Sequence, residues 1–219
     1  MSINKKMEVE KKKIRLDEVT LMRGILAVLI VFMHAFTVYG GSWREPAGYV
    51  DVPLYKWLCR TSFAFTLEGF VFISGYLFAF QRITLKRTGG GKNLIIGKLK
   101  RLMLPSIIFS LAYFLIFYEY QGFGKACYDI INGCGHMWYL PMLFWCFVGG
   151  WILEQIKVSE GIKLAVLVVA NLLSFFNLPF RLANAAQFMF YFYAGFVVYK
   201  HSGEIKQWAT GRKLIIGWV

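Results

Sequence analysis

The chain has 219 residues, of which 58% are hydrophobic and 17% are charged, and its formal net charge is +13. A soluble domain usually contains about 45–50% apolar residues, so this composition excludes an ordinary water-soluble domain and indicates a protein that lies in a lipid bilayer. The positive charge also suggests nucleic acid as a partner, and the positions of the charges along the chain must decide between the two.

Long apolar runs recur along the chain, and each approaches the roughly 17–25 residues with which a helix crosses a hydrocarbon core of about 30 Å. Membrane strands are a poor alternative, because runs such as GILAVLIVFM are continuously apolar and do not alternate with polar residues. We therefore predict an all-α fold, a polytopic transmembrane helical bundle with about six complete spans. The predicted spans cover residues 19–39, 62–80, 102–118, 137–153, 162–179 and 185–199.

The two ends of the chain differ from these spans. Residues 1–18 form a basic tail, and no small-residue cleavage site follows the first span, so we interpret that span as a retained anchor. The run LIIGWV at 214–219 is too short to cross a bilayer, and we interpret it as the start of a seventh helix. We expect a single integral membrane domain over residues 1–219 whose C-terminal spans are missing.

The basic residues are distributed asymmetrically between the predicted loops. With the N-terminus in the cytoplasm, the inner segments contain 20 of the 25 Lys and Arg residues, and the outer segments contain the other 5. The positive-inside rule accounts for this distribution, so we expect no nucleic-acid partner. We predict a multi-pass protein of the inner cell membrane with a cytoplasmic N-terminus, and the lipid bilayer as its first partner.

An arginine and a histidine border the apolar core of the first span. Arg23 and His34 are eleven residues apart, which is three helical turns plus about 20°, so both side chains leave one face of the helix about 16 Å apart along its axis. Arg23 alone is also consistent with a cation that snorkels to the inner boundary, and His34 alone with a core histidine bonded to a neighbouring helix. Together on one face they favour a polar channel or cleft.

Three further short motifs follow the first span. They are LEGFVFISGYLF at 67–78, KLKRLMLPS at 98–106 and HMWYLPML at 136–143. Together with the Arg-Gly pair and the histidine of the first span, they resemble in sequence and order the motifs of the membrane-bound acyltransferase-3 family. Members of this family move acyl groups, usually acetyl, onto sugars of cell-surface polysaccharides. The resemblance covers about residues 15–145, and residues 146–219 fit only as generic spans.

The chain departs from the family's pattern at one position of the first motif. The family usually has an aspartate three residues before the first-span arginine, where this chain has Thr20, with Asp17 and Glu18 a turn earlier. The family also has more spans than this chain, which agrees with the expectation that C-terminal spans are missing.

The resemblance implies acyl transfer to a sugar hydroxyl, with an acyl-coenzyme A as the donor substrate. We expect no bound cofactor and no metal. His34 matches the family's catalytic histidine, and a neutral imidazole near its ordinary pKa of about 6.5 can take the proton of an attacking hydroxyl. Arg23, on the same face but nearer the cytoplasm, is expected to hold anionic parts of the donor.

A basic inner loop is predicted over residues 82–101. It contains seven cations and no acid, and such a cluster binds the phosphates of coenzyme A well. Basic inner loops also set topology and contact anionic lipid headgroups, so only the residues that match the family's basic motif are candidates for donor binding. These candidates are Lys98, Lys100 and Arg101.

Four side chains are candidates for binding the acceptor, with structural alternatives. Glu68 is an acid within the second span, and it either binds an acceptor hydroxyl or pairs with Arg23 or His34. His136, Trp138 and Tyr139 lie at the predicted outer end of the fourth span, where they either form a sugar platform or belong to the interfacial aromatic belt.

Other reactive side chains give weaker signals. Ser74 in FISGY is conceivable as a nucleophile, but without a GxSxG elbow, helix packing by small residues is favoured. Cys127 and Cys134 lie in one predicted outer loop, where they are either a disulfide or unpaired apolar residues. Zinc is not expected, because the cysteines and histidines lack ligand spacing.

We therefore predict an integral membrane O-acyltransferase that moves an acyl group, in the simplest case acetyl, from acyl-coenzyme A to a hydroxyl of a cell-envelope carbohydrate. One rival is a transporter or exporter of an envelope precursor that uses Arg23, Glu68 and His34, although paired interrupted helices in repeated halves are not visible. The other rival is a non-catalytic, truncated membrane protein.

Overall fold

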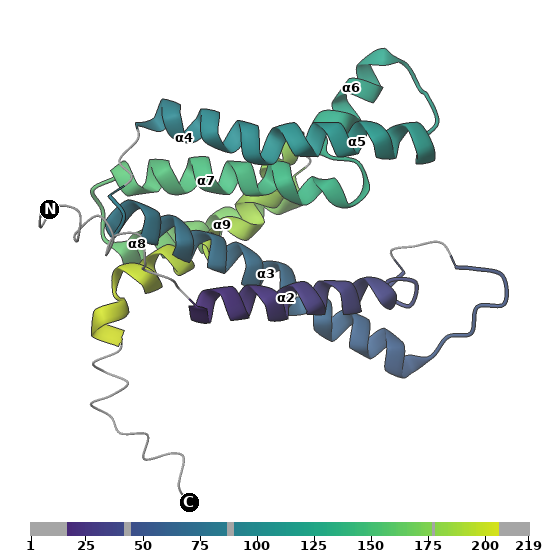
Figure 1. Cartoon of the computed structure of the whole chain (residues 1–219), viewed down its shortest axis with the longest axis horizontal. Helices are drawn as coiled ribbons and strands as arrows, with labels where there is room; N and C mark the ends of the chain where they lie inside the picture. Colours follow the sequence, from purple (N-terminus) through teal and green to yellow (C-terminus); the bar gives the residue numbers. More distant parts are fainter. Residues whose placement is uncertain (1–16, 42–44, 87–89, 177, 206–219) are drawn as a thin grey trace, which may run out of the picture. The chain divides into compact units, whose positions relative to one another are not determined.

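The computed structural model describes residues 17–41, 45–86, 90–176 and 178–205, which are helical or irregular and contain no strand. The chain forms two compact units, an N-terminal unit (Met1–Phe70) and a C-terminal unit (Val71–Val219), and helix α3 runs from one into the other. The elements of Figure 1 are α2 (Asp17–Ala35), α3 (Pro53–Ile83), α4 (Gly91–Lys98), the π-helix η1 (Leu99–Met103), α5 (Leu104–Phe117), α6 (Phe123–Asn132), the 3₁₀ helix η2 (Gly135–Trp138), α7 (Tyr139–Gln155), α8 (Glu160–Ala170), the 3₁₀ helices η3 (Asn171–Phe175) and η4 (Pro179–Arg181), and α9 (Leu182–Lys200).

Four helical segments of the described chain are long and apolar enough to cross a bilayer. Each overlaps one of the first four predicted spans, which confirms an all-helical membrane protein. The four segments are Asp17–Ala35, Pro53–Ile83, Gly91–Phe117 and Gly135–Gln155.

The count of about six spans is not confirmed. The predicted span 162–179 is divided, because α8 has only 11 residues and is followed by the 3₁₀ helix η3. Helix α9 has 19 residues and covers the predicted span 185–199, but its asparagine, glutamine and tyrosine side chains make it less apolar. The predicted seventh helix and nearly all of the basic tail lie outside the described residues.

The basic segment 82–101 is mostly helix, where the sequence predicted a loop. Helix α3 continues to Ile83 and α4 begins at Gly91, so the cations from residue 92 onward lie on a helix. The π-helix η1 follows, in which the Leu104 N–H donates to the Leu99 carbonyl, one residue further back than in an α-helix. Pro105 is the reason, since proline has no N–H and its ring would collide with the carbonyl four residues earlier in a regular helix.

The N-terminal unit consists of α2 and the first part of α3. Asp17 and Glu18 lie in the first turn of α2, where their charge complements the helix dipole. Leu26 fills the space beside Gly69, because a Cβ on that glycine would lie 3.1 Å from the Leu26 Cδ2 atom. After α2, the rings of Phe36 and Tyr39 both lie within 5.2 Å of the Tyr55 ring, centroid to centroid, and close this end of the unit.

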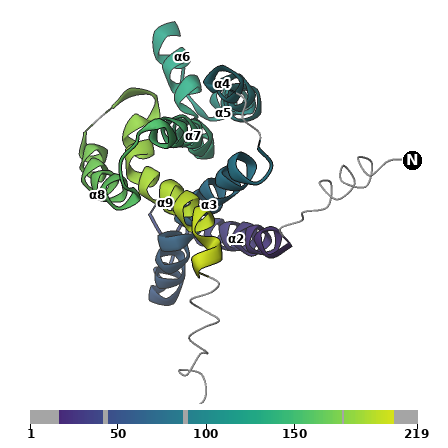
Figure 2. The same ribbon diagram turned by 90° about the vertical axis from the view of Figure 1, so that its left-hand side faces the viewer.

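The C-terminal unit is a bundle in which α7 lies between the α4–α5 rod and α9, with α8 against the other side of α9 (Figures 1 and 2). Phenylalanine rings from three helices meet in its core. Phe78 lies 5.6 Å from Phe147 and 5.9 Å from Phe192, and Phe147 lies 5.0 Å from Phe192, all between ring centroids. All three residues are less than 9% exposed.

Two glycines let α3 and α9 touch through their backbones. A Cβ on Gly75 would overlap the carbonyl oxygen of Phe192, and a Cβ on Gly195 would overlap that of Phe72. Close backbone approach at small residues is typical of helices that associate in lipid. Gly75 belongs to the FISGY motif, so this contact supports the prediction that the motif serves helix packing.

The four cysteines are all free, including Cys127 and Cys134 of the predicted outer loop. Cys134 is buried, its N–H donates to the Ser110 hydroxyl, and burial raises the pKa of its thiol. The structure therefore favours the unpaired interpretation of these two residues.

Candidate functional site

His34 lies near the C-terminal end of α2 and is half-buried. Its Nδ1 atom lies 2.7 Å from the Ile30 carbonyl oxygen, one turn earlier in the helix. A carbonyl oxygen only accepts, so Nδ1 carries the proton in this hydrogen bond. The neutral ring then has its lone pair on Nε2, which is the nitrogen that can accept a proton.

Arg23 lies three turns before His34 on the same helix, and it is exposed. By helix geometry, the buried residues Leu26 and Met33 lie about 60–90° around α2 from the line that joins Arg23 and His34. Because Leu26 packs against Gly69, the line of polar side chains runs along the edge of the face that meets α3. Arg23 and His34 thus share one side of α2, next to the face that packs against α3.

Glu68 precedes Gly69 on α3, within the same unit. Its Oε2 atom is buried and has no hydrogen-bond partner among the described residues. The Oε2 atom therefore makes no hydrogen bond with Arg23 or His34 in the part of the chain that the structure describes. A buried carboxylate oxygen without a donor is costly and marks a place where a proton or a ligand hydroxyl would be stabilised.

Two of the three donor-binding candidates line one cavity of the C-terminal unit. Lys98 and Arg101 border a space of about 220 Å³, together with Arg82 and Asn93. Lys98 also places its Nζ atom 3.2 Å from the centroid of the Phe147 ring, a cation–π contact.

Arg82 and Lys100 differ from these two cations. Arg82 donates to Glu154 at 2.9 Å, so its charge is compensated, whereas no carboxylate within 4 Å compensates Lys98 or Arg101 in the described chain. Lys100 is exposed and does not line the cavity. Lys98, at the end of α4, and Arg101, on η1, therefore lie together at one cavity, and Lys100 lies apart from it.

The three candidates of the HMWYLPML motif lie on η2 and at the start of α7. His136 is exposed, and its ring lies 6.5 Å from that of Tyr113. Trp138 is half-buried between aromatic rings, 6.3 Å from Tyr139 and 6.2 Å from Phe188. These contacts are compatible with a sugar platform and with an aromatic belt alike.

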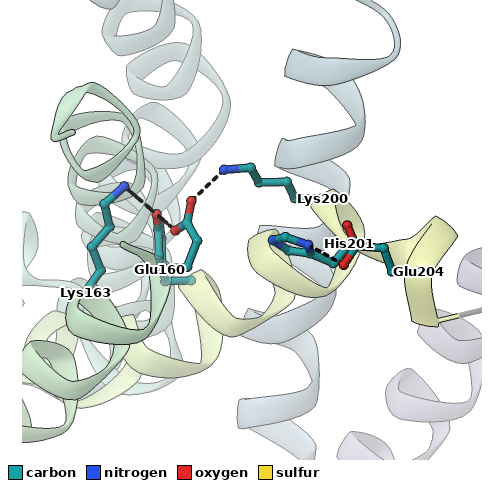
Figure 3. A network of polar contacts seen from close by, with 6 residues as sticks. Glu160, Lys163, Lys200, His201 and Glu204 are labelled. Carbon is teal, nitrogen blue, oxygen red and sulfur yellow. Dashed lines mark hydrogen bonds and ion pairs between the residues drawn. The ribbon is translucent and has the colours of Figure 1, made fainter. Parts of the chain in front are cut away.

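A polar network that the motifs did not indicate joins α8 to α9 (Figure 3). Glu160 accepts from Lys200 at 2.6 Å through one oxygen and from the Tyr193 hydroxyl at 2.5 Å through the other. Lys163, of which only 7% is exposed, donates to the Tyr193 hydroxyl at 3.1 Å and lies 3.7 Å from Glu160. Every polar atom at the centre of the network has a partner.

The ionisation of Glu160 follows from this network. Burial opposes its charged form, but the hydrogen bonds from Lys200 and Tyr193 and the charge of Lys163 outweigh burial and hold the pKa of the Glu160 carboxyl below its usual value. Sequence reasoning missed the network because Glu160 lies 33 residues from Tyr193 and 40 from Lys200. The available signal was an acid placed among the cations that follow the fourth predicted span and the sixth.

Comparison with known proteins agrees with the motifs. The model of the acyltransferase-3 family, described as an acyltransferase domain, matches residues 16–219. Searches of curated proteins and of solved structures gave no significant match. The matched range includes α8 and α9, so the likeness extends beyond residue 145, where the four motifs end.

Proposed function

The chain belongs to the acyltransferase-3 family of membrane acyltransferases, and we propose that it transfers an acyl group, acetyl in the simplest case, from acyl-coenzyme A to a hydroxyl group of a cell-envelope carbohydrate. We place it in the inner membrane with a cytoplasmic N-terminus, on the strength of the charge distribution. The observation that carries the proposal furthest is the hydrogen bond of His34, because Nδ1 has to donate to the Ile30 carbonyl, and a neutral ring would then accept a proton at Nε2.

In the proposed mechanism, His34 is the general base. The Nδ1–H group donates to the Ile30 carbonyl, which orients the ring, and Nε2 is the proposed acceptor of the proton. As the carbohydrate oxygen attacks the thioester carbonyl carbon, its proton passes to Nε2. The tetrahedral intermediate then breaks its carbon–sulfur bond, and the departing thiolate of coenzyme A takes that proton from the imidazolium.

The donor carries several phosphates, and cations are required to bind them. Arg23, exposed at the N-terminal end of α2, and the Lys98–Arg101 pair are the proposed contacts. Lys98 and Arg101 are favoured over Lys100 for binding the donor, since they share a cavity and have no carboxylate partner in the described chain. Lys100 is expected to have a smaller effect.

Glu68 is the proposed contact of the acceptor hydroxyl in the N-terminal unit. Its unpartnered Oε2 atom would accept a hydrogen bond from a carbohydrate hydroxyl and thereby satisfy its buried lone pairs. His136, Trp138 and Tyr139 are proposed as a platform for a sugar ring, supported by their grouping at one end of α7.

The test is transfer of label from radiolabelled acetyl-coenzyme A to an envelope polysaccharide fraction, catalysed by membranes that contain the chain. His34→Ala is expected to reduce the rate by at least about a hundredfold, since general base catalysis contributes about 10²–10⁴. His201→Ala is the matched control, because among the described residues the His201 side chain pairs with the exposed Glu204 alone. Equal rates for wild type and His34→Ala would contradict the assignment of the base, and absence of labelling with every acyl-coenzyme A would contradict the proposed function.

A further inference from the structure

A second cavity lies at the other end of the C-terminal unit from the Glu160 network, and it has a volume of about 520 Å³. Its walls come from α6, from the 3₁₀ helices η3 and η4, and from the first turn of α9. Polar and aromatic side chains that line it include Tyr128, Asp129, Ser174, Phe175, Arg181 and Asn184. None of these residues belongs to the four motifs of the family.

The wall at η4 is held in place by hydrogen bonds on both sides. Arg181 donates through Nε to the Asn132 carbonyl at 2.8 Å and through Nη2 to the Gly133 carbonyl at 3.2 Å. On the other side, the Trp145 indole N–H donates to the Phe180 carbonyl at 2.9 Å. Phe180 and Arg181 both have positive φ angles, 55° and 59°, a conformation that residues with side chains rarely adopt and that surrounding contacts must enforce.

Three polar side chains of the cavity have unused hydrogen-bonding capacity. Asp129 uses one oxygen, Oδ2, for an ion pair with Lys125, and its Oδ1 has no partner in the described chain. The Asn184 amide also has no hydrogen-bond partner within the described residues. In the same part of the chain, Arg181 donates through Nε and Nη2, and its Nη1 group has no partner. The cavity thus offers an acceptor, a donor and an amide that is both.

The combination of these groups with aromatic rings selects the class of ligand. A hydroxyl group donates and accepts, so neighbouring hydroxyls of a sugar match a carboxylate, an amide and a guanidinium placed together. Tyr128, Phe175 and Phe176 are each more than 40% exposed and supply faces for the apolar C–H surface of a sugar ring. The charged residues that line the cavity are Asp129 and Arg181, one of each sign, so the lining itself has no net positive charge to favour a phosphate or an anionic lipid headgroup.

The position of the cavity agrees with this ligand. It lies at the end of the unit where α5 ends and α7 begins, which is the outer end in the topology that the charges predict. We propose that this cavity binds the carbohydrate acceptor, with Asp129, Asn184 and Arg181 as its hydrogen-bonding residues. The identification of the ligand as the acceptor rests on the proposed function, and the presence of a carbohydrate site does not.

Binding is tested without any acyl donor. The probes are fluorescently labelled oligosaccharides of about two to six sugars, released from the envelope polysaccharide, and their anisotropy is followed as the purified chain in nanodiscs is added. Asp129→Asn removes the charge from the hydrogen bond to the ligand, and Asn184→Ala removes the hydrogen bond itself. Each is expected to weaken binding about tenfold, which corresponds to about 1.4 kcal/mol. Glu119→Gln and Gln155→Ala are the matched controls, since both side chains are exposed and lie outside the cavity, and they are expected to bind as the wild type does.

The transfer assay separates the two proposals. If wild type transfers acyl groups, the cavity variants are expected to raise KM for the carbohydrate while kcat stays within about twofold. Unchanged binding and unchanged KM in both variants would overturn the cavity as the acceptor site and leave the proposed function intact. Loss of binding in the variants, with no transfer by wild type, would retain the carbohydrate site and contradict acyl transfer. Displacement of the probe by phosphatidylglycerol vesicles but not by unlabelled oligosaccharide would overturn the assignment to a sugar.

Discussion

The two ends of the C-terminal unit both carry polar side chains, but they differ in how completely these are satisfied. At one end, the Glu160 carboxylate receives a hydrogen bond from Lys200 (Figure 3). It also accepts from Tyr193, to which the buried Lys163 donates. At the other end, about 25 Å away along the 17 residues of α7, Asp129 and Asn184 border a cavity and keep free hydrogen-bonding groups in the described chain.

The difference separates a structural role from a binding role. A saturated network contributes to stability, because removal of one member leaves another buried without a partner. Unsatisfied groups around an open cavity contribute little to stability, because water replaces any one of them, but they are the groups that a ligand uses. Substitutions in the Glu160 network should therefore lower mainly the stability of the chain, and substitutions at the cavity should weaken mainly the binding of a ligand.

The largest effect on stability is expected for Glu160→Ala. This change leaves the charge of Lys163, which is 7% exposed, without its carboxylate, and removes the acceptor of the fully buried Tyr193 hydroxyl. Breaking a buried ion pair in this way costs about 3 kcal/mol. Urea unfolding in detergent micelles measures the change, and Glu204→Ala, which removes an 80% exposed carboxylate, is expected to alter stability by less than about 0.5 kcal/mol. Equal stability of the two variants would contradict the structural role of the network.

The same network predicts a dependence of stability on pH. Because the pKa of Glu160 is lower in the folded chain than in the unfolded chain, its contribution is complete above the unfolded value of about 4.3 and is lost as the pH falls through the lower folded value. Thermal unfolding of the wild type between about pH 6 and pH 3 should show this loss. Glu160→Gln has no such titration, so a slope as steep as that of the wild type would show that other carboxyls are responsible.

An intermediate effect on stability is expected for Arg181→Ala, which acts on both properties. The change deprives the buried Asn132 and Gly133 carbonyls of their donors, which should cost about 1–2 kcal/mol, and it also removes a wall of the cavity. Arg181→Lys keeps the charge, but a single ammonium group cannot replace the planar guanidinium that donates to both carbonyls. This variant should therefore be more stable than Arg181→Ala and less stable than the wild type. Unfolding and oligosaccharide binding, measured on the same samples, check the prediction, which fails if either property is unaffected by Arg181→Ala.

The smallest effect on stability is expected for Asp129→Asn. The substitution keeps the shape of the side chain and loses only the ion pair with the 54% exposed Lys125, so the stability should change by no more than about 0.5 kcal/mol. Oligosaccharide binding should nevertheless weaken as described for the cavity. A loss of stability comparable to that of Glu160→Ala would remove the contrast between the two ends.

The motifs anticipated part of the candidate site. The eleven-residue step between Arg23 and His34 placed both on one face of a helix, as found in α2, and the FISGY motif indicated helix packing, as found at Gly75. The first result follows from the regular geometry of a helix, and the second from a single small residue, so both can be predicted from the sequence alone. The roles of His34, Arg23 and Glu68 in catalysis or binding stay predictions.

Other features could not be anticipated, because they depend on distant segments. The basic segment before Pro105 resembled a loop, since cations are common in inner loops. Only the structure revealed that its second half is helical, with a π-helix after Lys98 and the Lys98 amine over the Phe147 ring. Likewise, Asp129 and Asn184 are 55 residues apart in the sequence and border one cavity only because α6 and the start of α9 come together.

The sequence by itself determined the class of this protein, the position of its first four spans and the family to which it belongs. The class and the spans follow from the length of the apolar runs, because an unbonded backbone group is costly in lipid and a helix bonds all of its own backbone groups. The family follows from the short motifs. Only the tertiary structure decided which polar side chains are satisfied and which remain open to a ligand. Lipid does not drive helices together through the hydrophobic effect, so glycine contacts and individual hydrogen bonds select the pairing of helices, and that pairing sets the partners of each polar group.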